Sequence, residues 1–235
     1  GKVSMIFQEP MASFAPAIKI GHQMVEQLLL HKSLNKKEAK SISIDMLNRV
    51  GIADAEKRFN QYAFELSGGM RQRAMIAMAL STMPKLLLAD EPTTALDVSI
   101  QAQVINLIKD IIKEYNMGVI FITHDLGVIA QVADDVAVMY LGSIVEKGPV
   151  NEILKNPKHP YTKGLLNALP DINNLDAPLR PIPGNIPSPL ERPSGCVFRT
   201  RCPNPTHECK EGHVEMGLLE VSPGHWVDQC CINCG

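Results

Sequence analysis

Short apolar runs alternate with longer stretches of helical periodicity along most of the chain. Apolar runs of strand length predict strands at residues 3–8, 85–90, 118–123, 135–141 and 143–147. Helical periodicity predicts helices at residues 21–32, 35–50, 99–115, 126–133, 149–155 and 160–168. Because strands and helices alternate, we expect an α/β fold with a largely parallel sheet covered by helices.

The predicted helix at 35–50 has signals at both ends. Asn35 precedes it and Glu38 follows three positions later, which is the spacing of a capping box. Gly51 then ends it. We expect residues 10–80 to form a helical subdomain.

The last quarter of the chain differs in composition from the rest. Seven prolines fall between Pro170 and Pro193, a density that no helix or central strand tolerates. We therefore expect one domain at residues 1–169, a proline-rich connector at 170–195 and a cysteine-rich tail at 196–235.

Composition limits the classes of function. The 235 residues are 45% hydrophobic, which is enough for a real core, and the net charge of −2 gives no reason to expect a nucleic-acid partner. The longest apolar runs are strand-sized and too short to cross a membrane. At a membrane, such a chain would have to dock to another protein.

Two motifs carry the chemistry. Leu66–Arg73 places a serine and two glycines ahead of a helical run, so that backbone N–H groups at a helix N-terminus are available to a phosphate. In Leu86–Pro92, an apolar strand ends in two adjacent carboxylates. Asp90 is suited to hold Mg²⁺, and Glu91 to orient or deprotonate a water. Together the motifs indicate ATP hydrolysis.

These two motifs resemble the signature motif and the Walker B motif of ABC-type ATPases. Gln8 resembles the Q-loop glutamine, Ala95–Asp97 resembles the D-loop, and His124 resembles the switch histidine. The resemblance covers about residues 1 to 170 and implies the ABC-type P-loop NTPase fold.

The resemblance also implies a role for each matching residue. Glu91 would be the general base, His124 would contact the γ-phosphate, and Gln8 would couple the nucleotide state to the helical subdomain. Asp97 would lie at the junction of a head-to-tail dimer, although an Asp that opens a helix is also an ordinary N-cap. The signature residues would bind ATP held by the partner subunit; they are Ser67, Gly68, Gly69 and Gln72.

No G-x-x-x-x-G-K-[ST] phosphate loop occurs in the sequence, although the family places one upstream of Gln8. The favoured interpretation is that this loop lies upstream of Gly1 in a longer chain, so that the present residues alone would be inactive. A subunit that has lost the loop, and that donates only its signature motif to a partner, is the alternative.

Further stretches resemble the ATP-binding subunits of oligopeptide and dipeptide importers. They are Gln8–Met11, Thr93–Val98 and His159–Thr162. The resemblance implies a second ATPase subunit, transmembrane permease subunits, an external solute-binding protein and a place at the cytoplasmic face of the membrane. Some nickel importers share these stretches, so nickel stays open as the solute. An ABC protein of DNA repair or translation is disfavoured because paired cassettes and coiled-coil insertions are missing.

All six cysteines follow residue 195. Cys196, Cys202, Cys209 and Cys230 are spaced C-x₅-C-x₆-C-x₂₀-C, and four thiolates in a loop-rich segment suit an iron–sulfur cluster or zinc. The tail resembles the cysteine motif associated with a [4Fe–4S] cluster in some importer subunits, which favours the cluster over zinc. Cys231 or Cys234 could replace Cys230 as the last ligand, and thiols that bind no metal remain the simplest alternative.

Overall fold

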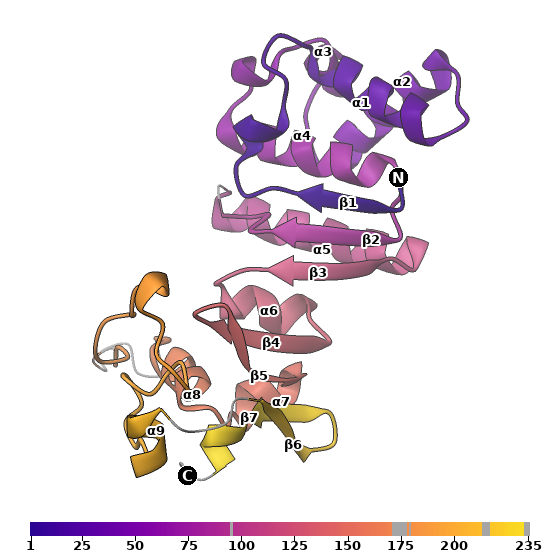
Figure 1. Cartoon of the computed structure of the whole chain (residues 1–235). Helices are drawn as coiled ribbons and strands as arrows, with labels where there is room; N and C mark the ends of the chain where they lie inside the picture. Colours follow the sequence, from indigo (N-terminus) through magenta and orange to yellow (C-terminus); the bar gives the residue numbers. More distant parts are fainter. Residues whose placement is uncertain (95, 171–177, 179, 213–216, 233–235) are drawn as a thin grey trace. The chain divides into compact units, whose positions relative to one another are not determined.

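A computed structural model describes residues 1–94, 96–170, 178, 180–212 and 217–232. The chain forms two compact units, Gly1–Val128 and Ile129–Gly235. Each unit is described by itself (Figure 1). Among the described residues, no helix is long and apolar enough to span a membrane.

Unit 1 contains a three-stranded parallel sheet in the order β1-β2-β3. The strands are β1 (Val3–Ile6), β2 (Leu86–Asp90) and β3 (Gly118–Ile122). Ile6 pairs with Ala89, which pairs with Phe121, so the three strands end at one edge. The predicted parallel sheet is confirmed for these strands.

Helices supply the rest of unit 1. They are α1 (Ile20–His31), α2 (Lys36–Arg49), α3 (Ala55–Phe59), α4 (Gly68–Ser81), α5 (Val98–Tyr115) and the 3₁₀ turns η1 (Pro10–Ser13) and η2 (Ala63–Glu65). The predicted capping box starts α2: the Asn35 side chain accepts the Glu38 N–H at 2.9 Å, and Glu38 accepts the Asn35 N–H at 2.8 Å. Gly51 follows α2 in the left-handed region, which a glycine adopts without steric cost.

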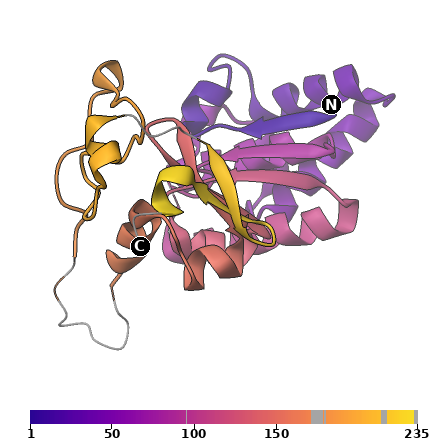
Figure 2. The same ribbon diagram turned by 60° about the horizontal axis from the view of Figure 1, so that its bottom comes forward.

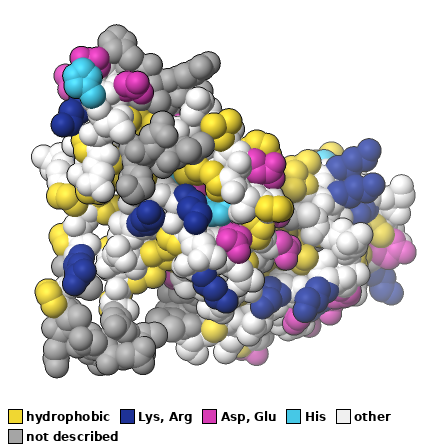
Figure 3. Space-filling view, turned by 90° about the horizontal axis from the view of Figure 1, so that it is seen from below, with side chains coloured by type: hydrophobic (Ala, Val, Ile, Leu, Met, Phe, Trp, Pro, Cys, Tyr) yellow, Lys and Arg dark blue, Asp and Glu magenta, His cyan; other side chains and the backbone are white. Residues whose placement is uncertain are grey.

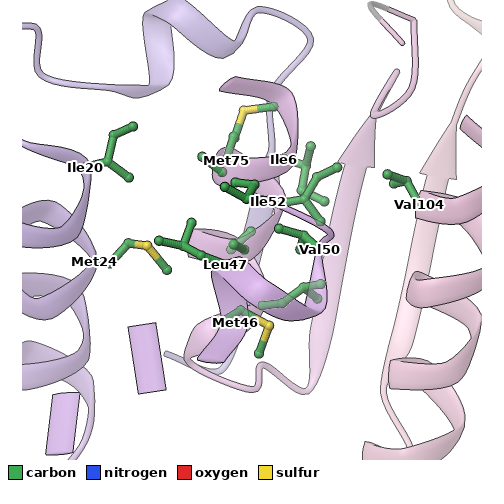
Figure 4. Packing of buried hydrophobic residues seen from close by; sticks show 14 of the residues in the cluster. Ile6, Ile20, Met24, Met46, Leu47, Val50, Ile52, Met75 and Val104 are labelled. Carbon is green, nitrogen blue, oxygen red and sulfur yellow. The ribbon is translucent and has the colours of Figure 1, made fainter. Parts of the chain in front are cut away.

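One continuous core joins the helical region to the sheet. Ile6 from β1, Met75 from α4 and Val104 from α5 belong to it (Figure 4). Leu87 from β2 belongs to it as well, and all four side chains are almost fully buried. The other face of the sheet is more open, with Val3, Ile120 and Ile122 about half exposed. The core therefore fixes α4 and α5 relative to the ends of the strands.

Unit 2 is built on an antiparallel sheet in the order β4-β5-β7-β6 (Figures 1 and 2). The strands are β4 (Asp135–Tyr140), β5 (Ser143–Pro149), β6 (Leu218–Ser222) and β7 (His225–Asp228). Leu141 and Gly142, between β4 and β5, both have positive φ, as a tight hairpin turn requires. Residues 135–149 are therefore a hairpin and not a continuation of the parallel sheet.

Short helices complete unit 2. They are α7 (Val150–Lys155), α8 (Pro160–Asn167), α9 (His207–Glu211) and the 3₁₀ turns η3 (Pro189–Glu191) and η4 (Gln229–Ile232), while α6 (Leu126–Val132) spans the boundary between the units. The predicted divisions at residues 169 and 195 differ from this arrangement, because β6 and β7 of the tail share a sheet with β4 and β5.

The sequence has 23 Lys and Arg residues against 25 Asp and Glu residues. On the face shown in Figure 3, Lys and Arg side chains and Asp and Glu side chains both lie scattered over the surface.

Candidate functional site

The predicted catalytic side chains meet at the carboxyl edge of the parallel sheet in unit 1. Gln8 follows β1, Glu91 follows β2 and His124 follows β3. Because the strands are parallel and in register, these three residues leave the sheet on the same side. The structure thus brings together residues that are up to 116 positions apart, from 8 to 124.

Glu91 is at the centre of this group. One carboxylate oxygen accepts hydrogen bonds from Gln8 Nε2 at 3.2 Å and from Thr94 Oγ1 at 2.9 Å. The other lies 3.0 Å from His124 Nδ1. The Glu91 backbone has a positive φ of 43°, and its N–H donates to the Ile122 carbonyl at 2.9 Å. Backbone and side chain together hold the carboxylate in place.

The hydrogen bonds keep Glu91 ionised. The bond to His124 lowers the pKa of the Glu91 carboxyl most, the bond to Thr94 adds to this, and desolvation opposes both. An ionised carboxylate at a strand end can accept a proton from water. The His124 side chain remains 72% exposed, so its ring is available to a ligand.

Asp90 and Asp97 flank Glu91 in the sequence. Asp90 is the half-buried last residue of β2. Asp97 is the N-cap of α5, where its carboxylate accepts the Ile100 N–H at 3.0 Å. The simpler of the two roles considered for Asp97, a helix cap, is therefore present in the structure. The Asp90 carboxylate lies at the same edge of the sheet as Glu91. It offers the oxygen ligands that a hard cation such as Mg²⁺ prefers.

The signature motif forms the start of α4. Ser67 is its N-cap, with its hydroxyl 3.4 Å from the Met70 N–H, and Gly68 and Gly69 are the first helical residues. A Cβ at Gly68 would meet no atom within 4 Å, so this end of the helix is open. Backbone N–H groups at an open N-terminus are suited to bind a phosphate.

Gln72 differs from the other signature residues because its side chain is completely buried. Its Nε2 donates a 2.6 Å hydrogen bond to the carbonyl of Pro92. This bond ties α4 to the loop that follows Glu91. A direct contact between the Gln72 side chain and a nucleotide would require the bond to open.

Sequence reasoning missed two contacts of this site. Thr94 lay inside a quoted motif without a role, yet it bonds Glu91. Asp125, next to His124, accepts the Gly127 N–H at 2.8 Å and a bond from Gln101 Nε2 at 3.2 Å. A polar residue directly after His124 and two before Gly127 was the available signal for this local turn.

Unit 2 gathers the tail thiols. Cys196, Cys209 and Cys230 are buried in one hydrophobic cluster, and Cys202 packs against it. Ligand atoms of Cys196, Cys230 and Asp228 lie within 4.8 Å of one another. Asp228 was not predicted, and Cys202 and Cys209 lie outside this closest group. The side chain of Cys231, and Cys234 as a whole, lie outside the described residues.

The two cysteines of this group contact each other. The hydrogen bond with Cys230 is the largest cause of a raised pKa of the Cys196 thiol, and burial adds to it. Burial also raises the pKa of Asp228, although backbone N–H groups of neighbouring residues partly oppose the shift. Two thiols and a carboxylate are a donor set that suits a thiophilic metal.

Two family models match parts of this chain. The family model "ABC transporter" matches residues 1–94, and the model "Oligopeptide/dipeptide transporter, C-terminal region" matches residues 145–209. Dimeric structures of the ATP-binding cassette MJ0796, one of them in a post-hydrolysis state bound to ADP and Pi, match with a TM-score of 0.58 at 24% identity. The match covers 63% of each chain and confirms the cassette fold.

Curated relatives match most of this chain. The oligopeptide transport ATP-binding proteins AppD of Bacillus subtilis and OppD of Salmonella typhimurium are both 50% identical to it, over 88% and 95% of its length. The chain spans only 63% of AppD and 66% of OppD. The dipeptide transport ATP-binding protein DppD of B. subtilis is 48% identical over 99% of this chain and 67% of its own length. The chain belongs to the family of oligopeptide and dipeptide ABC transporter ATP-binding proteins.

Proposed function

We propose that this chain is part of the ATP-hydrolysing subunit of an ABC importer for oligopeptides or dipeptides. One observation carries the proposal: Gln8, Thr94 and His124 surround an ionised Glu91 at the carboxyl edge of the parallel sheet. The names of AppD, OppD and DppD support peptides as the solute. Nickel is the alternative solute.

In this proposal Glu91 accepts the proton of the attacking water. Its lowered pKa keeps it unprotonated near neutral pH, and its bond to His124 aligns the imidazole with the reacting edge. The exposed His124 ring then contacts the terminal phosphate. Gln8, bonded to Glu91, transmits the presence or absence of that phosphate to the segment that follows it.

Asp90 fits a magnesium site. It is a half-buried carboxylate one residue before Glu91, at the end of a strand that faces the same edge. When bound, Mg²⁺ neutralises charge on the phosphates of ATP. Asp90 would hold this ion, directly or through water, while Glu91 stays free to act as the base.

Ser67, Gly68 and Gly69 would bind ATP held by a second subunit. Their open helix N-terminus supports this role, and so does the dimeric state of the related cassette structures. Asp97 would lie at the junction between the subunits. The second candidate function, a partner that donates only this signature face, rests on the same residues.

The remaining partners follow from the family. A peptide importer has transmembrane permease subunits and an external solute-binding protein, and its ATP-binding subunits act at the cytoplasmic face of the membrane. We propose that this chain docks there peripherally through the helical region of unit 1.

We further propose that the tail thiols hold a metal centre. A [4Fe–4S] cluster is favoured, and zinc is the alternative. The support is the donor set: Cys196, Cys209 and Cys230 share one buried cluster with the half-buried Cys202. When bound, such a centre would cross-link the loop-rich tail. Absorbance at visible wavelengths, together with iron, sulfide and zinc analysis of protein purified without oxygen, tests this part.

The ATPase proposal is tested by replacing Glu91 with glutamine. The tested protein carries the phosphate-loop segment of AppD fused ahead of Gly1. Glu91→Gln should bind ATP without hydrolysing it and should accumulate as an ATP-bound dimer in size-exclusion chromatography. The matched control is Glu56→Gln, because Glu56 is an exposed residue of α3 whose ion pair with Lys40 spans 3.9 Å. A dimer that forms equally in both variants, or in neither, would overturn the role of Glu91.

A further inference from the structure

Glu146 in β5 is a completely buried carboxylate with three donors. Its Oε1 lies 2.8 Å from Nε2 of His225, which is also completely buried, and accepts the Lys158 N–H at 2.6 Å. Its Oε2 accepts the His159 N–H at 3.1 Å. A buried carboxylate is costly unless such partners satisfy it, so these three hydrogen bonds stabilise Glu146 in its buried position.

The network fixes the strand that leads to one of the thiols. His225 is the first residue of β7, Asp228 is the last, and Cys230 follows in η4. β7 is only four residues long and pairs with β5 at two positions, Glu146↔Val227 and Lys147↔Trp226. The Glu146–His225 contact thus adds a third link between β5 and β7 to the two paired positions.

The segment that carries Cys196 packs against His159, whose backbone N–H donates to Glu146. Phe198, two residues after it, is buried and packs against the rings of His159, Tyr161 and Tyr140, with ring centroids 5.6, 5.5 and 5.2 Å away. His159 also accepts the Tyr161 N–H at 3.0 Å. The His159–Thr162 motif therefore supports the cysteine loop, a role that its sequence did not reveal.

We propose that Glu146 is a positioning residue for the thiol site. It holds β7 through His225 and the start of the His159–Thr162 motif through its backbone. These two elements place Cys230 and Cys196 opposite each other. The inference rests on the proposed metal binding by the thiols and adds to it the residue that sets the geometry.

The test measures metal affinity directly. Protein with reduced thiols is titrated with Co²⁺, whose thiolate charge-transfer absorbance reports binding by cysteine. In Glu146→Gln, the new NH₂ group cannot accept a hydrogen bond, so at least one buried donor loses its acceptor. We expect Co²⁺ affinity to fall at least tenfold and the emission of Trp226, the only tryptophan, to shift. Glu152→Gln is the control, because Glu152 makes an exposed 3.2 Å bond to Asn156; its affinity should stay within twofold of wild type.

Two further variants keep the test decisive if Glu146→Gln does not fold. His225→Gln retains an N–H donor for Glu146, whereas His225→Leu has similar volume and none. Co²⁺ affinity should be retained in the first and lost in the second. Equal affinities in the two variants, or wild-type affinity in a folded Glu146→Gln, would overturn the inference alone. A wild-type protein that binds neither Co²⁺ nor iron would overturn the proposed metal site itself.

Discussion

The buried bond between Gln72 and Pro92 gives a prediction that the structure can quantify. Gln72→Ala removes a 2.6 Å hydrogen bond and leaves the carbonyl of a buried proline without that partner. An unsatisfied buried group costs about 1–3 kcal/mol. The space left by the side chain adds to this cost. The loss of Gln72 Oε1, which has no hydrogen-bond partner among the described residues, offsets part of it. We expect a net destabilisation of about 2–3 kcal/mol.

Gln101→Ala is the matched control. Gln101 also lies in a helix and also donates through Nε2, but its 3.2 Å bond to Asp125 is exposed. The gain in helix propensity on changing Gln to Ala is the same at both sites and therefore cancels. An exposed substitution of this kind should cost no more than about 0.5 kcal/mol.

Urea unfolding followed by far-UV circular dichroism measures both variants. Fluorescence of Trp226, which lies in unit 2, serves as an internal reference for the unit that is not mutated. At a slope of about 1–3 kcal/mol per molar urea, a loss of about 2–3 kcal/mol should lower the unit 1 midpoint by roughly 0.7–3 M in Gln72→Ala. Equal midpoints for Gln72→Ala and Gln101→Ala would refute the claim that this bond anchors α4 to the Glu91 loop.

Three other predictions follow from the described contacts. A Cβ at Gly21 would lie 2.3 Å from the Phe59 ring, so Gly21→Ala should lower the free energy of unfolding in urea by about 1–3 kcal/mol. The control Gly68→Ala places its methyl group in open space and should show no such clash. Equal costs in the two variants would contradict the packing of α1 on α3. His124→Ala removes the largest cause of the lowered Glu91 pKa, so NMR titration should show that pKa rising toward its usual 4.5. Ionised Glu91 contributes stability that is present above its unfolded-state pKa and is lost as the pH falls through the lower folded value, and this contribution should shrink in the variant. An unchanged Glu91 pKa would exclude the His124 contact in solution. Burial lowers the pKa of His159 from 6.5 to about 4, so between these pH values the unfolded state binds more protons than the folded state. The free energy of unfolding of unit 2 should therefore increase by roughly 3 kcal/mol as the pH rises from 4 to 6.5. A free energy of unfolding, followed by Trp226 fluorescence, that does not change over this pH range would refute the burial of His159.

Local signals allowed the main elements of unit 1 to be predicted. Asn35 and Glu38 defined the start of α2, and the apolar runs around Leu87 and Ile120 defined parallel strands whose ends carry Glu91 and His124. These features depend on residues within one turn or one strand, which a single sequence displays directly.

Long-range pairing could not be predicted in the same way. β5 pairs with β7, about 80 residues away, and Glu146 of β5 contacts the buried His225 of β7. Neither residue has a local sequence pattern that shows this. The burial of Gln72 is similar: its partner is a backbone carbonyl, which every residue carries. The position of Asp228 beside Cys196 and Cys230 could not be predicted either, because a lone carboxylate has no characteristic sequence spacing.

The rate of ATP hydrolysis tests the central claim most directly. Phosphate release is measured for the chain carrying the AppD phosphate-loop segment ahead of Gly1, with Glu91 intact or changed to glutamine, and with Glu56→Gln as control. A positioned general base contributes about 10²–10⁴ in rate, so Glu91→Gln should lose at least a hundredfold while Glu56→Gln keeps the unmutated rate. Undiminished phosphate release by Glu91→Gln would show that the carboxylate held by Gln8, Thr94 and His124 is not the base.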